Sequence, residues 1–448
     1  EDYAHHPTEI RSFLAARRKL MPEHWMKVVF QSHRYSRTKA FAKSFAEELG
    51  MADELNLLPT YGAFEDYDEG GDAESLIGYL PPRLRNKTKV FADFPSFMEE
   101  NFQDEKTRCP DQVLFVGAGN LDNWAHAFAA IHSQRGDMVS SFAHFLEKRI
   151  SPNCILRRDE NLGSKTTMRV GGTALWYAEP FHTEDLRSLV EASNYFSIPR
   201  VMLGRGSNLI IPDEGYDGLV LRLRGEFWNE ISSRSDDSFV VGAGSRLKDI
   251  CRIACQRELT GFEFLEGIPG TLGGALRMNA GAMGWEIYDL VEWVSFLLPD
   301  GSIRQIPGSQ LNIGYRYCKE AQDGIALRAK LKAEGRSDHQ AIRFAIEELA
   351  KKRRASQPRE ASAGCIFKNP EGKSAGWLIE QCGMKGMRVG NAAVSKVHAN
   401  FIVNEGGAKA EDVIALMRKV QKRVSNETQI SLEPEVGILG GNWKDELS

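Results

Sequence analysis

The chain has 448 residues, of which 42% are hydrophobic and 26% are charged, and its formal net charge is −4. This length predicts about three compact units, and the charge gives no electrostatic reason to bind nucleic acid or an anionic membrane. No apolar run is long enough to span a membrane, and no secretory signal opens the chain. Seven cysteines without a CxxC pair favour a reducing, cytoplasmic setting without a metal site. Because the first residue is Glu1, we expect a segment of a longer polypeptide.

Residues 1–135 alternate strand and helix patterns. Buried strands are expected at residues 27–30 and 112–116, with an amphipathic helix at 39–49. Residues 61–74 are acidic and glycine-rich, which is typical of a solvated loop. The repetition predicts a Rossmann-like α/β domain with a mainly parallel sheet. Residues 136–154 are expected to link this domain to the rest of the chain.

From residue 167 short β-branched runs alternate with many glycines, and three loops stand out. Glycine permits positive φ and close backbone approach, so successive N–H groups can converge on a phosphate. Several such loops suit the diphosphate of a dinucleotide, whereas turns in a β-rich domain are the alternative interpretation. The candidate cofactor-binding residues are Arg169, Gly171 and Gly172 in the first loop, Gly204, Gly206, Ser207, Asn208 and Leu209 in the second, and Gly267, Ile268, Pro269, Gly270, Thr271, Gly273, Gly274, Asn279, Ala280, Gly281 and Ala282 in the third and its continuation.

Two further helices are predicted in the last third of the chain. Residues 336–356 have the pattern of a charged amphipathic helix. Residues 410–424 place one apolar stripe on a second helix, inside a final α/β unit. The stripe comprises Val413, Leu416, Met417, Val420 and Val424.

The glycine loops lie in longer motifs. RVGGTALWYAEP, LGRGSNLII and GIPGTLGGALRMNAGA resemble the flavin-binding motifs of UDP-N-acetylenolpyruvoylglucosamine reductase, and the resemblance continues through IGYR, GCIFKNP, VSKVHANFIVN and LEPEV. It covers about residues 155–440 in the family's order. It implies a vanillyl-alcohol-oxidase-type FAD-binding region with subdomains at 155–222 and 223–358, and an α/β substrate-binding domain at 359–442. The short spacing between IGYR and GCIFKNP resembles the shorter subtype of the family.

The resemblance also implies a reaction and its co-substrates. The family uses NADPH to reduce bound FAD, and the flavin then reduces the enolpyruvyl ether of UDP-N-acetylglucosamine to UDP-N-acetylmuramate, in peptidoglycan precursor synthesis. Negative charge develops beside the substrate carboxylate during hydride transfer. Such a reaction needs a fixed cation and a proton donor at the reacting end of the flavin.

The IGYR and EPEV motifs supply two of the expected catalytic residues. Arg316 matches the family's catalytic arginine, whose guanidinium can hold a carboxylate bidentately. Glu435 matches the catalytic glutamate. Glu433 stays an alternative, because alternation along a strand would place it on the same face as Glu435.

The GCIFKNP loop departs from the family pattern at the proton donor. The usual serine is replaced by Cys365, a stronger acid that is mostly protonated at neutral pH. A buried packing cysteine is the alternative interpretation. Lys368 and Asn369 match positions near the substrate, so we expect them to bind it.

The first segment carries a second resemblance. EDYAHHPTEI, VVFQSHRYSRT and LFVGAGN are similar to the C-terminal domain of UDP-N-acetylmuramate–L-alanine ligase, with His33, Arg34 and Arg37 in the motif that faces the ligase active site. No phosphate-binding loop G-x-x-x-x-G-K-[ST] occurs in the chain. We therefore expect no ligase activity from this segment alone, and the missing ligase domains upstream in the native polypeptide.

Two other functions are compatible with these motifs. One is a flavin oxidase of small alcohols or sugars with the same fold, which would react with oxygen. The other is a non-catalytic assembly module with a vestigial flavin site. IGYR, FKNP and EPEV occurring together favour the reductase over both.

Overall fold

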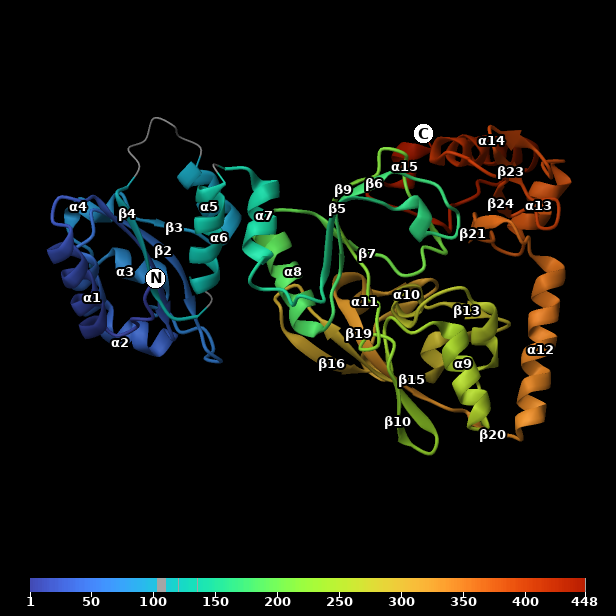
Figure 1. Cartoon of the computed structure of the whole chain (residues 1–448), viewed down its shortest axis with the longest axis horizontal. Coiled ribbons are helices and arrows are strands. Elements are labelled where there is room, and N and C mark those ends of the chain that lie inside the picture. The colour runs from blue at the N-terminus through green and yellow to red at the C-terminus, as the bar shows by residue number, and fades with distance from the viewer. Residues whose placement is uncertain (103–109, 120, 135, 448) are drawn as a thin grey trace. The chain divides into compact units, whose positions relative to one another are not determined.

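The computed structural model describes residues 1–102, 110–119, 121–134 and 136–447 (Figure 1). Cys109, Asn120 of the LFVGAGN motif and Arg135 therefore lie outside the described residues. The chain divides into two compact units, Glu1–Arg149 with Ala192–Ser197, and Ile150–Glu191 with Ile198–Ser448. Within the described residues, no helix has both the length and the apolar character needed to cross a membrane.

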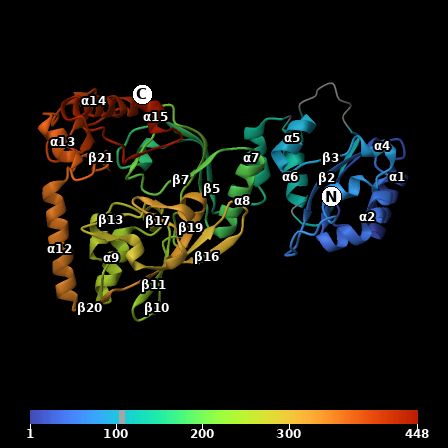
Figure 2. The same ribbon diagram turned by 180° about the vertical axis from the view of Figure 1, so that it is seen from behind.

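The first unit is a parallel α/β layer structure. Its four strands are ordered β3-β2-β1-β4, with α1 and α2 on one side of the sheet and α5 and α6 on the other (Figures 1 and 2). The strands are β1 (Met26–His33), β2 (Glu54–Tyr61), β3 (Lys89–Val90) and β4 (Gln112–Gly117). The helices are α1 (Pro7–Leu20), α2 (Tyr35–Leu49), α3 (Ala73–Ile77), α4 (Pro82–Arg85), α5 (Phe94–Phe102), α6 (Leu121–Ser133) and α7 (Met138–Leu146).

Both strands and the helix predicted for the first unit are confirmed as β1, β4 and α2. Residues 138–146 of the expected junction form α7, which belongs to the first unit. Its side chains Phe142 and Leu146 are fully buried. The expected domain bounds stay a prediction.

The second unit begins with a four-stranded sheet in the order β5-β6-β9-β7. Its elements are β5 (Ile155–Asn161), β6 (Thr173–Glu179), α8 (Thr183–Tyr195), β7 (Arg200–Met202), β8 (Leu209–Ile210) and β9 (Tyr216–Leu221). Gly206 leads from β7 towards β8 at φ +59, and a Cβ there would lie 2.7 Å from the Thr166 side chain. The loop between β7 and β8 therefore needs glycine for both conformation and space.

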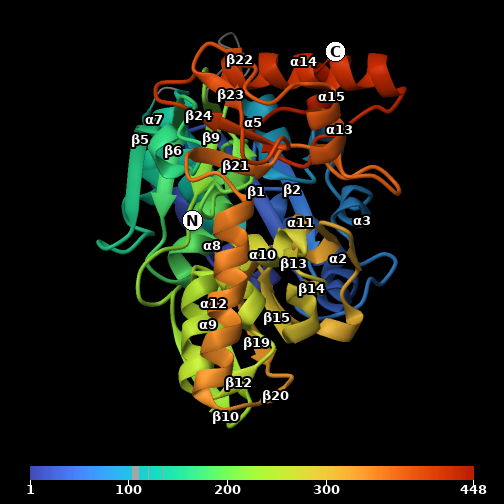
Figure 3. The ribbon, with the colours of Figure 1, turned by 90° about the vertical axis from the view of Figure 1, so that its right-hand side faces the viewer.

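A five-stranded antiparallel sheet follows, in the order β10-β11-β19-β15-β16. Its strands are β10 (Ile231–Ser235), β11 (Ser238–Gly242), β15 (Val291–Leu297), β16 (Ile303–Pro307) and β19 (Ile325–Lys332). Around it lie α9 (Leu247–Gln256), β12 (Leu259–Thr260), the 3-10 helix η2 (Glu263–Gly267), α10 (Leu272–Met278), β13 (Gly281–Ala282), β14 (Trp285–Glu286), β17 (Ile313–Gly314), β18 (Tyr317–Cys318), α11 (Lys319–Asp323) and β20 (Gly335–Arg336). The predicted charged helix is α12 (His339–Ser356), which packs against η2 and α9 (Figure 3).

The last sheet has the order β21-β24-β23-β22 and is covered by α13 and α14. Its elements are β21 (Ala361–Cys365), α13 (Ala375–Gln381), β22 (Arg388–Val389), β23 (Ala392–Val394), β24 (Phe401–Asn404), α14 (Ala410–Thr428), β25 (Gly437–Ile438) and α15 (Trp443–Glu446). All five residues of the predicted apolar stripe on α14 are buried, which confirms that helix and its core face. The chain then returns to the segment that follows β7, where β25 pairs in parallel with β8 as a separate two-stranded sheet.

Candidate active site

The second and third glycine loops line a cavity of about 500 Å³ in the second unit. This cavity has a size typical of small-molecule sites. Arg316, Gly364 and Glu435 belong to its wall, although they come from the β17–β18 hairpin, from β21 and from the segment before β25. Because β25 pairs with β8, the C-terminal segment lies against the second glycine loop. The predicted cofactor-binding residues that line the cavity are Gly204, Gly206, Ser207, Asn208, Leu209, Ile268, Pro269, Gly270, Thr271, Gly274, Ala280 and Gly281.

The first glycine loop does not line this cavity. A Cβ on Gly171, at φ +112, would lie 2.5 Å from Ile211, and one on Gly172 would lie 2.3 Å from the carbonyl oxygen of Asp213. Arg169 is exposed, and its carbonyl accepts a hydrogen bond from Asn404. A Cβ on either glycine would therefore meet protein, as expected for a turn. The cofactor-binding role of Arg169, Gly171 and Gly172 stays a prediction.

Four residues of the third loop and its continuation also lie outside this cavity: Gly267, Gly273, Asn279 and Ala282. Asn279 instead contacts the β17–β18 hairpin that carries Arg316. It ends α10 in the left-handed conformation, and its amide donates to Glu286 and to the carbonyl of Gly314. The main-chain carbonyl of Asn279 accepts a hydrogen bond from Arg316 Nη1 at 3.4 Å.

Arg316 and Glu435 form an ion pair on the cavity wall. Arg316 Nε donates to Glu435 Oε1 at 2.9 Å, and both side chains are largely shielded from solvent. Burial alone would lower the pKa of Arg316, but the hydrogen bond and charge of Glu435 outweigh it and raise that pKa. Arg316 has φ +56, a strained conformation for a residue other than glycine. Such strain gathers at functional sites.

Glu433 and Glu435 have separate environments. Glu435 N donates to the Ile366 carbonyl at 2.8 Å, and the Glu435 carbonyl accepts from Asn208 at 3.2 Å. Glu433 is instead exposed and pairs with Lys368 at 3.2 Å. Both were expected on one face of a strand, but the structure has only an isolated bridge at Pro434. Proline lacks the N–H that a continuous ladder needs.

Cys365 ends β21 directly after the cavity residue Gly364. Burial raises the pKa of its thiol to about 11, and the charge of Glu435 acts in the same direction. Arg316 and Arg353 oppose this shift through their positive charges. At neutral pH the side chain is therefore a protonated thiol that feels the charges of the arginine–glutamate pair, although its neighbour Gly364, and not Cys365, lines the cavity.

Lys368 and Asn369 lie outside this cavity. Lys368 pairs with Glu433, and the Asn369 carbonyl accepts the N–H of Ala375 at 3.0 Å at the start of α13. Their predicted contact with substrate stays a prediction.

Two arginines near the site were not among the residues predicted from the sequence. Arg205 lines the cavity, and its Nε is buried without a hydrogen-bond partner in the described protein. Arg353 on α12 approaches the back of the third loop, where a Cβ on Gly267 would lie 2.8 Å from its Nη1. Arg205 sits inside LGRGSN and could have been found there, whereas Arg353 looks like any cation on a charged helix.

The residues present are suited to FAD. A Cβ on Gly204 would lie 2.9 Å from Thr271 Oγ1, so the second and third loops approach each other closely at one point. Arg205 supplies an unsatisfied donor beside that point. Backbone N–H groups, a hydroxyl and a guanidinium together are suitable partners for a diphosphate.

Known proteins resemble this unit along almost all of its length. A model described as "FAD binding domain" matches residues 174–306, and one described as "UDP-N-acetylenolpyruvoylglucosamine reductase, C-terminal domain" matches residues 357–439. The UDP-N-acetylenolpyruvoylglucosamine reductase of Pelobacter propionicus is 39% identical over 286 residues, which are 64% of this chain and 96% of that protein. UDP-N-acetylenolpyruvoylglucosamine reductase 2 of Symbiobacterium thermophilum is 40% identical over 68% of this chain and 98% of its own length.

A solved structure agrees with these relatives. The crystal structure of the reductase from Thermus caldophilus has 38% sequence identity and a TM-score of 0.56, and it is covered over 99% of its length by 63% of this chain. Near-complete coverage of such relatives, together with a flavin cavity that holds Arg316 and Glu435, assigns the chain: it is an FAD-dependent oxidoreductase that belongs to the UDP-N-acetylenolpyruvoylglucosamine reductase family.

Proposed function

We propose that Arg316, Cys365 and Glu435 carry out the reduction of UDP-N-acetylglucosamine enolpyruvate to UDP-N-acetylmuramate in the cytoplasm, with NADPH as the reductant. The observation that carries this proposal is the Arg316–Glu435 ion pair on the wall of the flavin cavity. Cys365 directly follows the wall residue Gly364, and the charges of both members of the pair act on its thiol. FAD held by the glycine loops would supply the hydride-transfer chemistry between NADPH and the vinyl carbon of the substrate.

Arg316 holds the carboxylate of the substrate. Glu435 accepts from Nε, and the main-chain carbonyl of Asn279 accepts a long hydrogen bond from Nη1, so Nη2 is the nitrogen left for the substrate carboxylate. The ion pair also fixes the planar group before substrate binds, so little reorganisation is needed when negative charge develops. Glu435 is therefore a positioning residue for Arg316 in this proposal.

Cys365 donates the proton that completes the reduction. Its raised pKa keeps the thiol protonated at neutral pH, and the carbanion that forms next to the substrate carboxylate is a much stronger base than a thiolate. After transfer, the positive charges of Arg316 and Arg353 stabilise the thiolate. Solvent then reprotonates Cys365 before the next turnover.

A product assay tests the proposed reaction. Purified chain with FAD, NADPH and the enolpyruvyl sugar nucleotide should yield UDP-N-acetylmuramate, whose mass exceeds that of the substrate by two hydrogen atoms. The paired measurement omits NADPH and should give no product. Failure of the complete mixture to form this product would overturn the proposal.

We propose in addition that the first unit retains the substrate-facing side of a UDP-N-acetylmuramate–L-alanine ligase C-terminal domain. Its support is a group of polar atoms at the end of β1 that are buried without hydrogen-bond partners in the described protein: Gln31 Oε1, His33 Nδ1 and Arg37 Nη1. Burial, with a further contribution from Arg37, lowers the pKa of His33, so its ring is neutral at pH 7. Ligands of parallel α/β sheets bind at the carboxyl ends of the strands.

The absent phosphate-binding loop limits what this unit can do. The chain mixed with ATP, UDP-N-acetylmuramate and L-alanine should release no phosphate, and measurable turnover would contradict the proposal. In a longer native polypeptide, joining the reductase to a ligase would raise the local concentration of their shared intermediate. A competing ligase added to the full-length polypeptide should still trap part of that intermediate, because we expect no sealed channel.

A further inference from the structure

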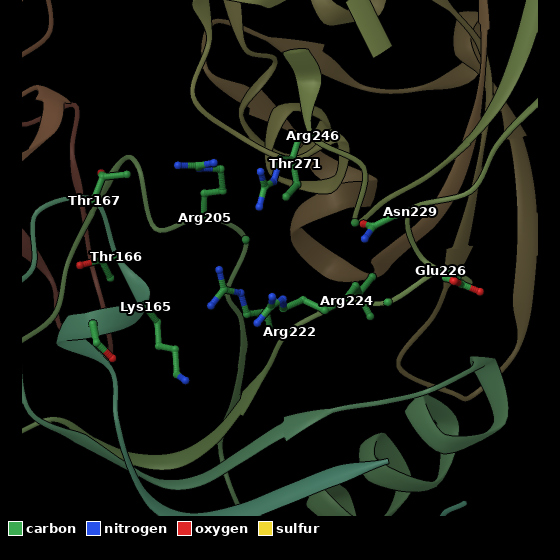
Figure 4. Close-up of a pocket in the computed structure, with 15 residues that line it drawn as sticks. Lys165, Thr166, Thr167, Arg205, Arg222, Arg224, Glu226, Asn229, Arg246 and Thr271 are labelled. Carbon is green, nitrogen blue, oxygen red and sulfur yellow. The ribbon is translucent and has the colours of Figure 1, made fainter. Parts of the chain in front are cut away.

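Asn279 is a buried polar residue that lines neither large cavity of the second unit. It is absent from the wall of the flavin cavity and from that of a neighbouring cavity of about 890 Å³, which Figure 4 shows with Arg222 and Arg246 on its wall. Only 1% of Asn279 is exposed. Any effect of this residue on the reaction must therefore pass through other residues.

The β17–β18 hairpin, which carries Arg316, depends on support from outside. Each of its strands has two residues, and Tyr315 and Arg316 form the tip between them. A hairpin of this size is not stable by itself. Arg316 has φ +56, a conformation that costs energy in a residue other than glycine and that the surroundings must hold in place. The position of the Arg316 guanidinium is therefore set by contacts from other segments.

Asn279 contacts this hairpin at two points. Its side-chain Nδ2 donates to the main-chain carbonyl of Gly314 at 3.2 Å, and its own main-chain carbonyl accepts from Arg316 Nη1 at 3.4 Å. The same Nδ2 donates to Glu286 Oε2 at 2.5 Å. Glu286 is itself anchored, because it caps the 3-10 helix η3 (Ile287–Leu290) in a reciprocal capping box. Asn279 thus ties the hairpin to a fixed carboxylate.

The amide of Asn279 is oriented at the expense of its oxygen. Both side-chain contacts are with acceptors, a carboxylate and a carbonyl, so the nitrogen and not the oxygen must face them. Asn279 Oδ1 is consequently buried without a hydrogen-bond partner among the residues that the structure describes. A buried polar atom without a partner is unfavourable. The contacts with Glu286 and Gly314 therefore take precedence over full hydrogen bonding of the amide.

We propose that Asn279 is a positioning residue for Arg316 in the substrate-dependent step. Glu435 accepts from Nε and Asn279 accepts from Nη1, so the two acceptors fix the plane of the guanidinium and direct Nη2 towards the substrate carboxylate. The inference rests on the proposed function, in which Arg316 holds that carboxylate. Asn279 then acts on the reduction of the enolpyruvyl sugar nucleotide, and neither on FAD binding nor on the reduction of FAD by NADPH.

Asn279→Gly separates this role from helix capping. Asn279 ends α10 in the left-handed conformation, which glycine adopts at least as easily, so the variant keeps the helix end and loses only the amide. Stopped-flow reoxidation by the enolpyruvyl sugar nucleotide should slow by about ten- to a hundredfold, as expected for a misplaced binding group. FAD affinity and FAD reduction by NADPH should stay near the parent values. Gln429→Gly is the matched control, because Gln429 ends α14 in the same conformation and lies outside the cavity.

Asn279→Asp adds a pH signature. When ionised, the new carboxylate faces Glu286 and the Gly314 carbonyl without a proton to donate. Two adjacent carboxylates raise the pKa of one of them, so a lower pH restores a donor. The reoxidation rate relative to the parent should therefore recover by about fivefold or more from pH 8 to pH 5. A residue that only caps α10 would show no such recovery, and this variant also provides the test if Asn279→Gly disturbs folding.

The double variant Asn279→Gly with Arg316→Lys tests whether Asn279 acts through Arg316. Once Arg316→Lys has removed the guanidinium, adding Asn279→Gly should slow reoxidation by less than about threefold, because both changes affect one group. Multiplication of the two single effects, or parent-like reoxidation in Asn279→Gly, would overturn the inference and leave the proposed function standing. Weaker FAD binding with an unchanged saturated rate would return Asn279 to the cofactor site. If Arg316→Lys itself reoxidised at the parent rate, the proposed role of Arg316 would fail, and this inference with it.

Discussion

The two ends of the flavin cavity are built from different parts of the polypeptide. At the reacting end, distant segments come together: Arg316 from a hairpin pairs with Glu435 from the returning C-terminal segment, and Cys365 follows the wall residue Gly364 on β21. At the nucleotide end, the wall is mainly the backbone of two glycine loops, joined where Gly204 approaches Thr271.

This difference separates rate from affinity. Side chains at the reacting end act on charge and protons during the reaction, so their loss should slow chemistry while FAD stays bound. Backbone at the nucleotide end acts on the cofactor in its resting state, so changes there should weaken FAD binding. A substitution at the reacting end that weakened FAD binding, or one at the nucleotide end that slowed only the reaction, would contradict this division.

The largest expected effect is at Cys365. Cys365→Ala should leave the reduction of bound FAD by NADPH nearly intact, because that step needs no proton at the substrate carbon. Reoxidation by the enolpyruvyl substrate should slow by about a hundred- to ten-thousandfold, as expected for a lost general acid. Stopped-flow absorbance separates the two steps, and Cys365→Ser should restore much of the rate. Reoxidation of the alanine variant at the parent rate would make Cys365 a packing residue.

A slightly smaller effect is expected at Arg316. Arg316→Lys keeps the charge but loses the two-pronged geometry that holds Glu435 and the substrate together. Reoxidation by substrate should slow by about a hundred- to a thousandfold, the scale of a lost oxyanion donor. Arg304→Lys on β16 is the matched control, since Arg304 is exposed and outside the cavity. Equal effects in the two variants would remove Arg316 from the proposed role.

Gly204→Ala should act on affinity. Its Cβ would lie 2.9 Å from Thr271 Oγ1, so the two loops must separate where the diphosphate is expected. FAD binding should weaken by about tenfold, on the order of 1.4 kcal/mol, with the rate of the FAD-saturated protein nearly unchanged. Fluorescence titration measures the first quantity and single-turnover kinetics the second. If Gly204→Ala bound FAD as tightly as the parent but reacted more slowly when saturated with FAD, this loop would belong to the reacting end instead.

Gly171→Ala should act on stability alone. The new Cβ would lie 2.5 Å from Ile211 at φ +112, which combines a clash with backbone strain. The free energy of unfolding should fall by about 1–3 kcal/mol, and the folded fraction should bind FAD with parent affinity. Denaturant titration and FAD titration check the two statements. A selective loss of FAD affinity would return the first loop to the cofactor site.

The smallest effect concerns pH. Because burial raises the pKa of Cys365 to about 11, the thiol keeps its proton until the pH approaches that value. The substrate-dependent rate should therefore change less than twofold between pH 7 and pH 9 on account of Cys365. A thiol with the ordinary pKa of about 8.5 would be only about a quarter protonated at pH 9 and would slow accordingly. Such a decline in the parent, absent in Cys365→Ser, would contradict the raised pKa.

The sequence was most informative where one short segment carries the feature. The strands β1 and β4 and the stripe on α14 followed from local periodicity. Glycine patterns were less informative, because they indicate a close approach of the backbone but not whether its neighbour is protein or a ligand. The loop at Gly171 approaches Ile211, whereas the loop at Gly204 lines the cavity.

Features that depend on distant partners could not be predicted from the sequence. Arg353 is one of several cations on α12, and its approach to Gly267 requires that helix to pack against η2. Glu433 stayed an alternative to Glu435, because the partners that distinguish them, Lys368 and Arg316, come from other segments of the chain.

The most direct test of the central claim is which electron acceptor reoxidises the flavin. Purified protein is reduced anaerobically with one equivalent of NADPH and then mixed with either the enolpyruvyl sugar nucleotide or dissolved oxygen. A reductase whose Arg316, Cys365 and Glu435 act on that substrate predicts rapid return of flavin absorbance with the sugar nucleotide and a much slower return with oxygen. Rapid reoxidation by oxygen and none by the sugar nucleotide would identify an oxidase and contradict the account.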